Sequence, residues 1–319
     1  MQLIFFQIRV LMFQTNTQIS KYVIIEEIGD GGMGVVYKAR DVELDRVVAL
    51  KCFKPFFDID DTGRDRFFLE AKATSKLDHP NICTLYGVEE ADNGQIFMVM
   101  SYYSGGTLSH KMEQGKMPLD QVLTIAAQMA SGLGFAHEHQ IIHRDIKPGN
   151  IMFDGLGIVK IVDFGIAKLL DHPPLTNPGT VLGTMAYMPP EQAEGEPVNH
   201  QADIWSFGVV LYEMLCGKQP FEGKTEQQIY EAILMETPTP CFRLNSEVPK
   251  PLSAIVDRSL EKSLEDRYNS FSQVLSDLEA FRTGESPDPD DDQDPNPPLP
   301  SENRHLFGWF SNLRDRMRR

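Results

Sequence analysis

Hydrophobic and polar positions divide the chain into two parts of different periodicity. Residues 22–54 alternate between apolar and polar side chains and are rich in Val and Ile around a group of glycines, which predicts strands joined by tight turns. Residues 64–77 have helical spacing, and the apolar run 95–100 predicts a further strand. This first part is therefore predicted to form a small β-rich lobe.

From residue 119 onward the apolar positions recur at helical spacing. A helix over 119–139 would bring five apolar residues to one face: Val122, Ile125, Met129, Leu133 and Ala136. Further helices are predicted over 201–216, 225–235, 251–260 and 271–282. We therefore expect an α+β fold with two lobes, in which a larger helical lobe follows the β-rich one.

Composition and charge narrow the class of protein. With 41% hydrophobic and 24% charged residues, the chain resembles a globular protein rather than a disordered or membrane-embedded one. Its net charge of −16 argues against a nucleic-acid partner, since sequence-independent binding needs a basic face. The four cysteines are far apart without a C-x-x-C pair, which fits neither a zinc site nor a disulfide framework and indicates a reducing compartment.

The ends of the chain differ from its middle. Residues 1–21 form an N-terminal extension, and two interpretations of residues 1–11 stay open: an ordered docking segment, or translation that begins at Met12. Residues 283–303 are predicted to be an acidic, proline-rich, disordered linker, because 284–303 hold seven acids, six prolines and no base. The region between, residues 22–282, is predicted to be the folded domain.

The last segment, residues 304–319, is a basic amphipathic tail. It carries five arginines and one aspartate, and its apolar residues fall at helical spacing: Leu306, Trp309, Phe310, Leu313 and Met317. Such a segment could lie on an anionic membrane surface or dock on a partner. Folding back onto the acidic domain and a disordered end are the alternatives. We expect a cytoplasmic protein, peripheral at the inner face of the membrane if the tail binds there.

A glycine-rich segment lies in the β-rich part. It reads Gly29-Asp30-Gly31-Gly32-Met33-Gly34-Val35-Val36. Glycines let a backbone approach phosphates closely and turn its N–H groups toward the anion. A dinucleotide fold uses the same string, and a plain hairpin is a further alternative. A dinucleotide site expects a helix directly afterwards, whereas here a strand-like run follows.

Lys51 follows in the sequence Val-Ala-Leu-Lys, 22 residues after Gly29. An ammonium group in an apolar strand needs an anionic partner, because an unpaired buried charge is costly. Glu70, on the predicted 64–77 helix, is the best candidate. Lys51 could then offer its charge to the α- and β-phosphates of a nucleotide.

The most specific signal is a pair of motifs behind the long helix. His143-Arg-Asp145-Ile-Lys147-Pro-Gly-Asn150 is followed by Asp163-Phe-Gly, 18 residues after Asp145. Phosphoryl transfer needs a carboxylate that orients the attacking hydroxyl and accepts its proton, divalent metal between phosphates, and positive charge at the γ-phosphate. Asp145 could be the catalytic carboxylate, Asn150 and Asp163 could be metal ligands, and Lys147 could neutralise the γ-phosphate.

This ordered set of motifs resembles the protein-kinase family, and the resemblance covers residues 22–282. It is similar to bacterial, eukaryotic-like (Hanks-type) serine/threonine kinases, notably in Gly31-Gly-Met-Gly-Val-Val-Tyr-Lys and Asp78-His-Pro-Asn-Ile. Lys147 after the catalytic aspartate and Gly183-Thr184 before Glu191 favour the serine/threonine branch. The resemblance implies protein substrates, a two-lobed kinase fold, and ATP with Mg²⁺ (or Mn²⁺ in its place) in the cleft.

The resemblance also assigns residues. Val36, Ala49 and Met152 would sandwich adenine, Met100 would be the gatekeeper, and Ser101 to Tyr103 would form the hinge. Asp203 would brace the catalytic loop, and Glu191 would pair with Arg267. The expected ATP-binding residues are Ile28, Gly29, Asp30, Gly31, Gly32, Met33, Gly34, Val35, Val36, Ala49, Lys51, Glu70, Met100, Ser101, Tyr103 and Met152.

Regulation is expected in the loop between Asp163 and Glu191. Arg144 could clamp a phosphate there, and the candidate phosphorylation sites are Thr176 and then Thr180. Thr184 is expected to stay unmodified beside Asp145. We predict autophosphorylation in trans, within a dimer.

A pseudokinase scaffold is the competing class. It is disfavoured because the five residues whose loss would indicate a scaffold are all present: Lys51, Glu70, Asp145, Asn150 and Asp163.

Overall fold

A computed structural model describes residues 13–30, 34–53, 68, 71–91, 94–164 and 185–285. These residues belong to the first of two units, residues 1–286. The second unit, residues 287–319, lies entirely outside the described residues, and so does the basic tail.

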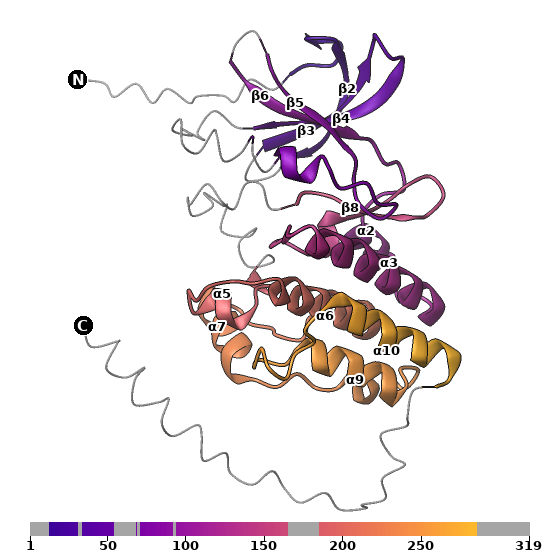
Figure 1. Ribbon diagram of the computed structural model, residues 1–319, viewed down its shortest axis with the longest axis vertical. Coiled ribbons are helices and arrows are strands. Elements are labelled where there is room, and N and C mark those ends of the chain that lie inside the picture. Colours follow the sequence, from indigo (N-terminus) through magenta and orange to yellow (C-terminus); the bar gives the residue numbers. More distant parts are fainter. Residues whose placement is uncertain are drawn as a thin grey trace, which may run out of the picture. The chain divides into compact units, whose positions relative to one another are not determined.

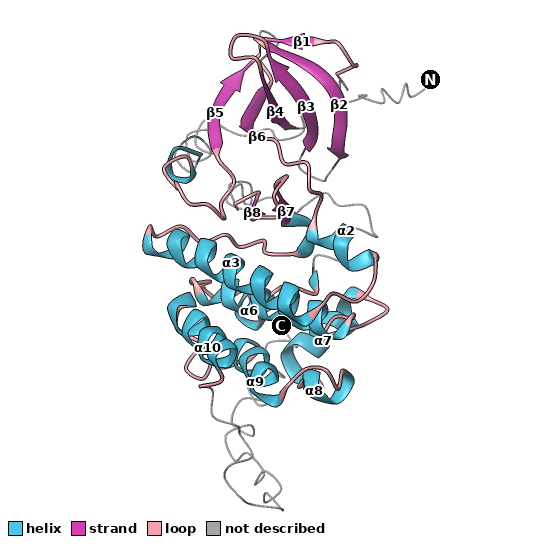
Figure 2. Cartoon of the chain, turned by 90° about the vertical axis from the view of Figure 1, so that its right-hand side faces the viewer, coloured by secondary structure: helices cyan, strands magenta, loops and turns pink. Residues whose placement is uncertain are grey.

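An antiparallel sheet of six strands forms the first lobe, in the order β1-β2-β3-β4-β6-β5 (Figure 2). The strands are β1 (Gln18–Ile19), β2 (Tyr22–Asp30), β3 (Gly34–Asp41), β4 (Arg46–Phe53), β5 (Leu85–Glu90) and β6 (Ile96–Ser101). Side chains alternate in burial along β3, where Val35, Tyr37 and Ala39 are buried against one face. Period-two patterning of this kind is what the sequence predicts for a half-buried strand.

Helices form most of the second lobe (Figure 1). They are α2 (Leu108–Glu113), α3 (Leu119–Glu138), α5 (Pro190–Ala193), α6 (Gln201–Cys216), α7 (Glu226–Met235), α8 (Cys241–Leu244), α9 (Lys250–Ser259) and α10 (Phe271–Thr283). A short hairpin of β7 (Ile151–Phe153) and β8 (Val159–Ile161) follows the 3₁₀ turn η1 (Pro148–Asn150). The predicted two-lobed fold is confirmed, and the bounds predicted for α3, α6, α7, α9 and α10 agree to within about one residue. The helix predicted over 64–77 ends earlier, at residue 74.

Local sequence explains where these helices begin and end. Ser270 caps α10 by accepting a hydrogen bond from the backbone N–H of Gln273, and Thr225 caps α7 in the same way. Gly217 and Gly284 end α6 and α10 with φ angles of 71° and 75°, a left-handed conformation that favours glycine.

α6 is the central helix of the second lobe. Almost all of its residues are buried, and it packs against α3 and α9. A Cβ atom at Gly208 would lie 2.7 Å from the Cβ of Ser259 on α9, so the absence of a side chain permits this close approach. Because α6 is packed on several sides, the residues of its first turn have a well-fixed position.

The described chain already contacts the sheet before residue 22. β1 pairs with β2, and the ring of Phe13 packs edge-on against Tyr37 at a centroid distance of 5.8 Å. The backbone N–H of Phe13 also donates to the hydroxyl of Tyr37 at 3.2 Å. Residues 13–21, which the sequence-based boundary assigns to the extension, therefore contribute to the packing of the first lobe.

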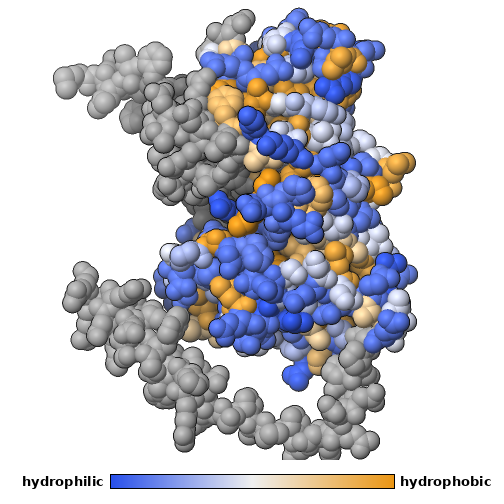
Figure 3. Space-filling view, in the orientation of Figure 1, coloured by the Kyte–Doolittle hydropathy of each residue, from blue (hydrophilic) through white to orange (hydrophobic). Residues whose placement is uncertain are grey.

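The surface of the described residues is mainly hydrophilic on the face that Figure 3 shows, with apolar residues scattered between. Among the helices that the structure describes, none is both long and apolar enough to cross a lipid bilayer.

Candidate active site

The glycine-rich segment joins β2 to β3. Gly29 lies opposite Val36 in the register of this hairpin. A Cβ atom at Gly34 would come within 2.3 Å of the carbonyl oxygen of Cys52 in β4, so only glycine fits at this point. The described residues of the segment are Ile28, Gly29 and Asp30 on β2, and Gly34, Val35 and Val36 on β3.

An apolar cluster lies between the sheet and the β7–β8 hairpin. It contains the three residues expected to sandwich adenine, Val36, Ala49 and Met152, together with the expected gatekeeper Met100 and Tyr103 of the expected hinge. These side chains come from four separate segments, and folding brings them together. Apolar side chains of this kind suit a flat aromatic base.

The predicted hinge begins at the end of β6. The N–H of Ser101 donates to the carbonyl of Thr84 at 3.0 Å, and its hydroxyl donates to the hydroxyl of Tyr86 at 2.9 Å. The side chain of Ser101 therefore forms its hydrogen bond with a residue of β5. Its backbone follows β6 directly into the segment that carries Tyr103.

Lys51 and Asp163 form an ion pair across the site. The Nζ atom of Lys51 lies 2.8 Å from Oδ1 of Asp163. The lysine side chain is only 12% exposed, so its charge is held in a poorly solvated place. Asp163 has a φ of 60°, a left-handed conformation that is unusual for any residue other than glycine and is seen at functional sites.

Two of the predicted residues, Lys147 and Asn150, bind the carboxylate of a third, Asp145. Oδ2 of Asp145 accepts hydrogen bonds from Nζ of Lys147 at 2.8 Å and from Nδ2 of Asn150 at 3.0 Å. Nδ2 of Asn150 also donates to the backbone carbonyl of Asp145 at 2.7 Å. The amide nitrogen of Asn150 is thus committed to Asp145, and its oxygen is the atom that suits a metal.

Asp203, in the first turn of α6, binds the backbone of the two residues directly before Asp145. Its two oxygens accept hydrogen bonds from the backbone N–H groups of His143 at 2.8 Å and of Arg144 at 2.7 Å. Arg144 has a φ of 65°, and these hydrogen bonds fix that strained turn directly before Asp145. The buried helix α6 therefore determines where the carboxylate of Asp145 lies.

Two histidines complete this support. Nε2 of His137 lies 2.8 Å from Oδ2 of Asp203. Burial alone would raise the pKa of Asp203, but the hydrogen bond and electrostatic interaction with His137, together with the backbone N–H of His143, hold that pKa below its ordinary value. Burial lowers the pKa of His143, whose Nε2 donates to the carbonyl of Val162 at 2.9 Å while its Nδ1 accepts from the N–H of Asp145. A neutral His143 thus links the catalytic loop to the Asp163 segment.

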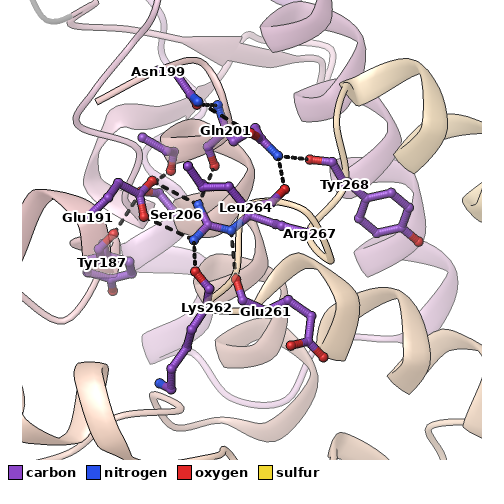
Figure 4. A network of polar contacts seen from close by, with 11 residues as sticks. Tyr187, Glu191, Asn199, Gln201, Ser206, Glu261, Lys262, Leu264, Arg267 and Tyr268 are labelled. Carbon is purple, nitrogen blue, oxygen red and sulfur yellow. Dashed lines mark hydrogen bonds and ion pairs between the residues drawn. The ribbon is translucent and has the colours of Figure 1, made fainter. Parts of the chain in front are cut away.

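A buried ion pair ties α5 to the segment before α10. The guanidinium of Arg267 donates to both oxygens of Glu191, at 3.0 and 3.1 Å, and both side chains are almost fully buried. Figure 4 shows the guanidinium between this carboxylate and the backbone carbonyls of Gln201, Glu261 and Lys262. Glu191 marks the C-terminal end of the loop expected between Asp163 and Glu191. Its ion pair with Arg267 therefore fixes the position of that end.

Several predicted residues lie outside the described residues. They are Gly31, Gly32 and Met33 of the glycine-rich segment, Glu70 of the expected partner helix, and the loop threonines Thr176, Thr180 and Thr184. The proposed pairing of Lys51 with Glu70 therefore stays a prediction.

Sequence reasoning missed two contributors. His137 carries no signal, because a histidine in the last turn of a helix is usually explained by the helix dipole. Tyr187 donates to the carboxylate of Glu213 at 2.6 Å, and burial raises the pKa of Glu213, but neither residue belongs to a motif of the sequence. The Tyr187–Glu213 pair becomes visible only when α6 is packed against the segment before α5.

The residues present fit a divalent cation in their chemistry. Asn150 and Asp163 supply hard oxygen atoms, and magnesium prefers few protein ligands completed by phosphate and water. No group of three His, Cys, Asp or Glu side chains is gathered for a metal in the part of the chain that the structure describes. A cation at this site would therefore depend on the nucleotide for further ligands.

Comparison with known proteins gives a consistent match. The family described as "Protein kinase domain" matches residues 22–278. A probable serine/threonine-protein kinase of Clostridium acetobutylicum is 40% identical over 260 residues, which are 81% of this chain and 39% of the relative. Serine/threonine-protein kinase PrkC of Bacillus subtilis is 38% identical over 81% of this chain and 40% of its own length. The chain thus spans about two fifths of the length of these curated relatives.

Solved structures agree on the fold. The kinase domain of Mycobacterium tuberculosis PknI superposes with a TM-score of 0.65, covering 84% of this chain and 99–100% of the matched chains. At 23% sequence identity, this likeness concerns the fold alone.

Proposed function

Since the chain belongs to the protein kinase family, we propose that it transfers the γ-phosphate of ATP to serine or threonine hydroxyls of protein substrates. The observation that carries the proposal is the cluster on Asp145, whose carboxylate is held by Lys147 and Asn150. The serine/threonine preference rests on Lys147 and on the relatives, which are named as serine/threonine-protein kinases.

Asp145 would act as the proton acceptor. As the substrate oxygen forms its bond to the γ-phosphorus, the hydroxyl proton passes to this carboxylate, and the bond from the γ-phosphorus to the bridging oxygen breaks to release ADP. Lys147, whose ammonium lies 2.8 Å from the same carboxylate, would offset charge on the transferred group. Lys51 would hold the α- and β-phosphates.

A divalent cation would supply further positive charge between the phosphates, held by Asn150 and Asp163. We expect chelation with EDTA to reduce transfer from labelled ATP to a generic basic protein to background, and Mg²⁺ to restore it. Asp163→Asn should raise the Mg²⁺ concentration needed for half-maximal transfer by about tenfold or more, since it removes one charged ligand. The exposed Asp120→Asn is the matched control; undiminished transfer in EDTA would contradict the metal assignment.

Autophosphorylation of the loop is the second part of the proposal. Phosphate on Thr176 or Thr180 could be bound by Arg144 and would order the loop. We expect mass spectrometry to find phosphate on these threonines in the wild-type chain and none in Asp145→Asn expressed in the same host. A phosphorylated loop in the inactive variant would mean that another kinase modifies it. Mixing active chain with tagged Asp145→Asn tests transfer within a transient dimer.

The basic tail would bring the enzyme to an anionic membrane surface. Residues 304–319 hold five arginines on an amphipathic pattern, and a surface rich in anionic lipid attracts such segments. The full chain should co-sediment with vesicles containing anionic lipid, and a chain that ends at residue 303 should not. Equal partitioning of both chains would show that the tail does not bind the membrane surface. Dependence on ATP and four free thiols favour action in the reducing, ATP-supplied cytoplasm.

A further inference from the structure

Two cysteines that are 25 positions apart in the sequence meet at the far end of α6. Cys216 is the last residue of α6, and Cys241 is the first residue of α8. The two helices pack together, with α7 in the sequence between them. Neither thiol belongs to the active site or to any motif of the family resemblance.

Hydrogen bonds on both sides hold the two helix ends together. Tyr212, one helical turn before Cys216, donates its hydroxyl proton to the carbonyl of Thr239 at 3.0 Å. Asn245, one turn after Cys241, donates its amide to the carbonyl of Leu215 at 2.8 Å. These two contacts join the segments that carry the cysteines, so the fold holds the C-terminal end of α6 against the start of α8.

The two thiols differ in environment. Cys241 is fully buried in the core of the second lobe, whereas Cys216 is only partly buried. Cys216 lines a cavity of about 640 Å³, which also borders Gly217, Leu244 and Asn245. A small polar oxidant can therefore reach Cys216 first.

Electrostatics favour the same order of reaction. A hydrogen bond from the Cys241 thiol lowers the pKa of Cys216, and the nearby Lys218 adds to this, while burial and Asp257 oppose it. The same hydrogen bond and burial raise the pKa of Cys241. The thiolate is the nucleophilic form, so the more exposed cysteine is also the more reactive one.

We propose that Cys216 and Cys241 form a reversible disulfide when the chain meets a hydroperoxide. The Cys216 thiolate attacks one peroxide oxygen, the O–O bond breaks, and Cys216 becomes a sulfenic acid while the other oxygen leaves as water or an alcohol. The Cys241 sulfur then displaces the hydroxyl group, and its own proton leaves with that group as water. In sum, two thiols and one hydrogen peroxide give one disulfide and two water molecules.

The modification would join the end of α6 to the start of α8. A disulfide in a protein of a reducing compartment is usually transient and redox-sensing, which agrees with the free thiols of the resting chain. The link would fix the wall of the cavity, on which Leu215 and Leu244 also lie. α6 carries Asp203 at its other end, but the inference requires no change at that end.

The test uses the full chain, reduced and then freed of reductant. After treatment with a few equivalents of hydrogen peroxide and alkylation of remaining thiols, trypsin should release peptides 169–218 and 225–243 as one species, lighter by two hydrogens than their sum. More than half of the chains should carry this link, and dithiothreitol should release both peptides. Cys52 and Cys83 are internal controls: burial raises the pKa of each to about 12, so they should remain alkylated thiols.

Two variants distinguish a disulfide from simple oxidation. Cys241→Ser should leave a Cys216 sulfenic acid that dimedone traps, and Cys216→Ser should leave Cys241 as an alkylated thiol. Because Cys241 is buried, the wild-type cross-link is the measurement that decides. Recovery of Cys216 as sulfinic or sulfonic acid beside alkylated Cys241, or of both as alkylated thiols, would overturn the proposal.

Discussion

Replacing Asp145 with Asn is expected to reduce phosphoryl transfer by about 10²- to 10⁴-fold, the contribution that a positioned proton acceptor typically makes. The amide has nearly the shape of the carboxylate, but it cannot accept the hydroxyl proton. It also loses the charge that attracts Lys147 at 2.8 Å, so the lysine is no longer held beside it. The initial rate of transfer from labelled ATP to a generic basic protein measures the effect.

The control for this prediction is Asp120→Asn, a change of the same type at an exposed position of α3. We expect this variant to keep the wild-type rate. Thermal unfolding of both variants should match the wild-type chain to within a few degrees, which separates loss of chemistry from loss of fold. An Asp145→Asn enzyme with more than about a tenth of the wild-type rate would exclude Asp145 as the proton acceptor.

Replacing Arg267 with Ala is expected to lower the free energy of unfolding by about 3–5 kcal/mol, the usual effect of removing one partner of a buried ion pair. Glu191 would keep its charge in a place that is 6% exposed and would lose both of its guanidinium contacts. The carbonyls of Glu261 and Gln201 would lose their donors too. Thermal unfolding monitored by circular dichroism should show a midpoint lower by roughly 6 °C or more.

Lys116→Ala provides the matched control. Lys116 and Glu247 also form an ion pair, at 2.7 Å, but their side chains are 52% and 72% exposed. Exposed pairs of this kind contribute about 0–1 kcal/mol, since water and salt screen them. An equal loss of stability in the two variants would show that burial does not determine the contribution of the Arg267 pair.

The sequence predicted the fold well because its hydrophobic periods are strong. The helix that became α6 is rich in apolar residues, and its bounds of 201–216 agree with the structure. Capping residues such as Ser270 and glycines such as Gly217 mark the helix ends locally. Such features depend on neighbouring residues alone, so the sequence contains them in readable form.

The first strand could not be predicted, because it depends on contacts with distant residues. β1 has only two residues, and neither its length nor its composition distinguishes it from a loop. It forms because β2 provides a partner and because Phe13 packs on Tyr37, which is a distant contact. The start of the domain therefore depends on tertiary structure that no local pattern encodes.

The motifs of the sequence predict which residues belong to the candidate site, but they say little about the contacts between them. The motifs named Lys51, Asp145 and Asp163, and the structure brings all three into one site. The expected partner of Lys51 was Glu70, whereas the described contact is with Asp163. Glu70 lies outside the described residues, so its pairing with Lys51 stays a prediction, and sequence spacing gave no sign of the Asp163 contact.

His137 illustrates what the sequence leaves hidden. Its contact with Asp203 joins residues 66 positions apart, and it helps to keep the carboxylate of Asp203 ionised under the catalytic loop. Only the packing of α3 against α6 creates this pair. Long-range polar contacts of this kind require the structure.

The central claim, phosphoryl transfer to serine or threonine, is tested most directly by phosphoamino-acid analysis. The chain and its Asp145→Asn variant are incubated with γ-labelled ATP, Mg²⁺ and a generic basic protein, and the labelled protein is hydrolysed in acid. We expect label on phosphoserine and phosphothreonine with the wild-type chain, and at least a hundredfold less with the variant. Label on phosphotyrosine, or equally little label with both chains, would contradict the claim, and the second result would favour a scaffold.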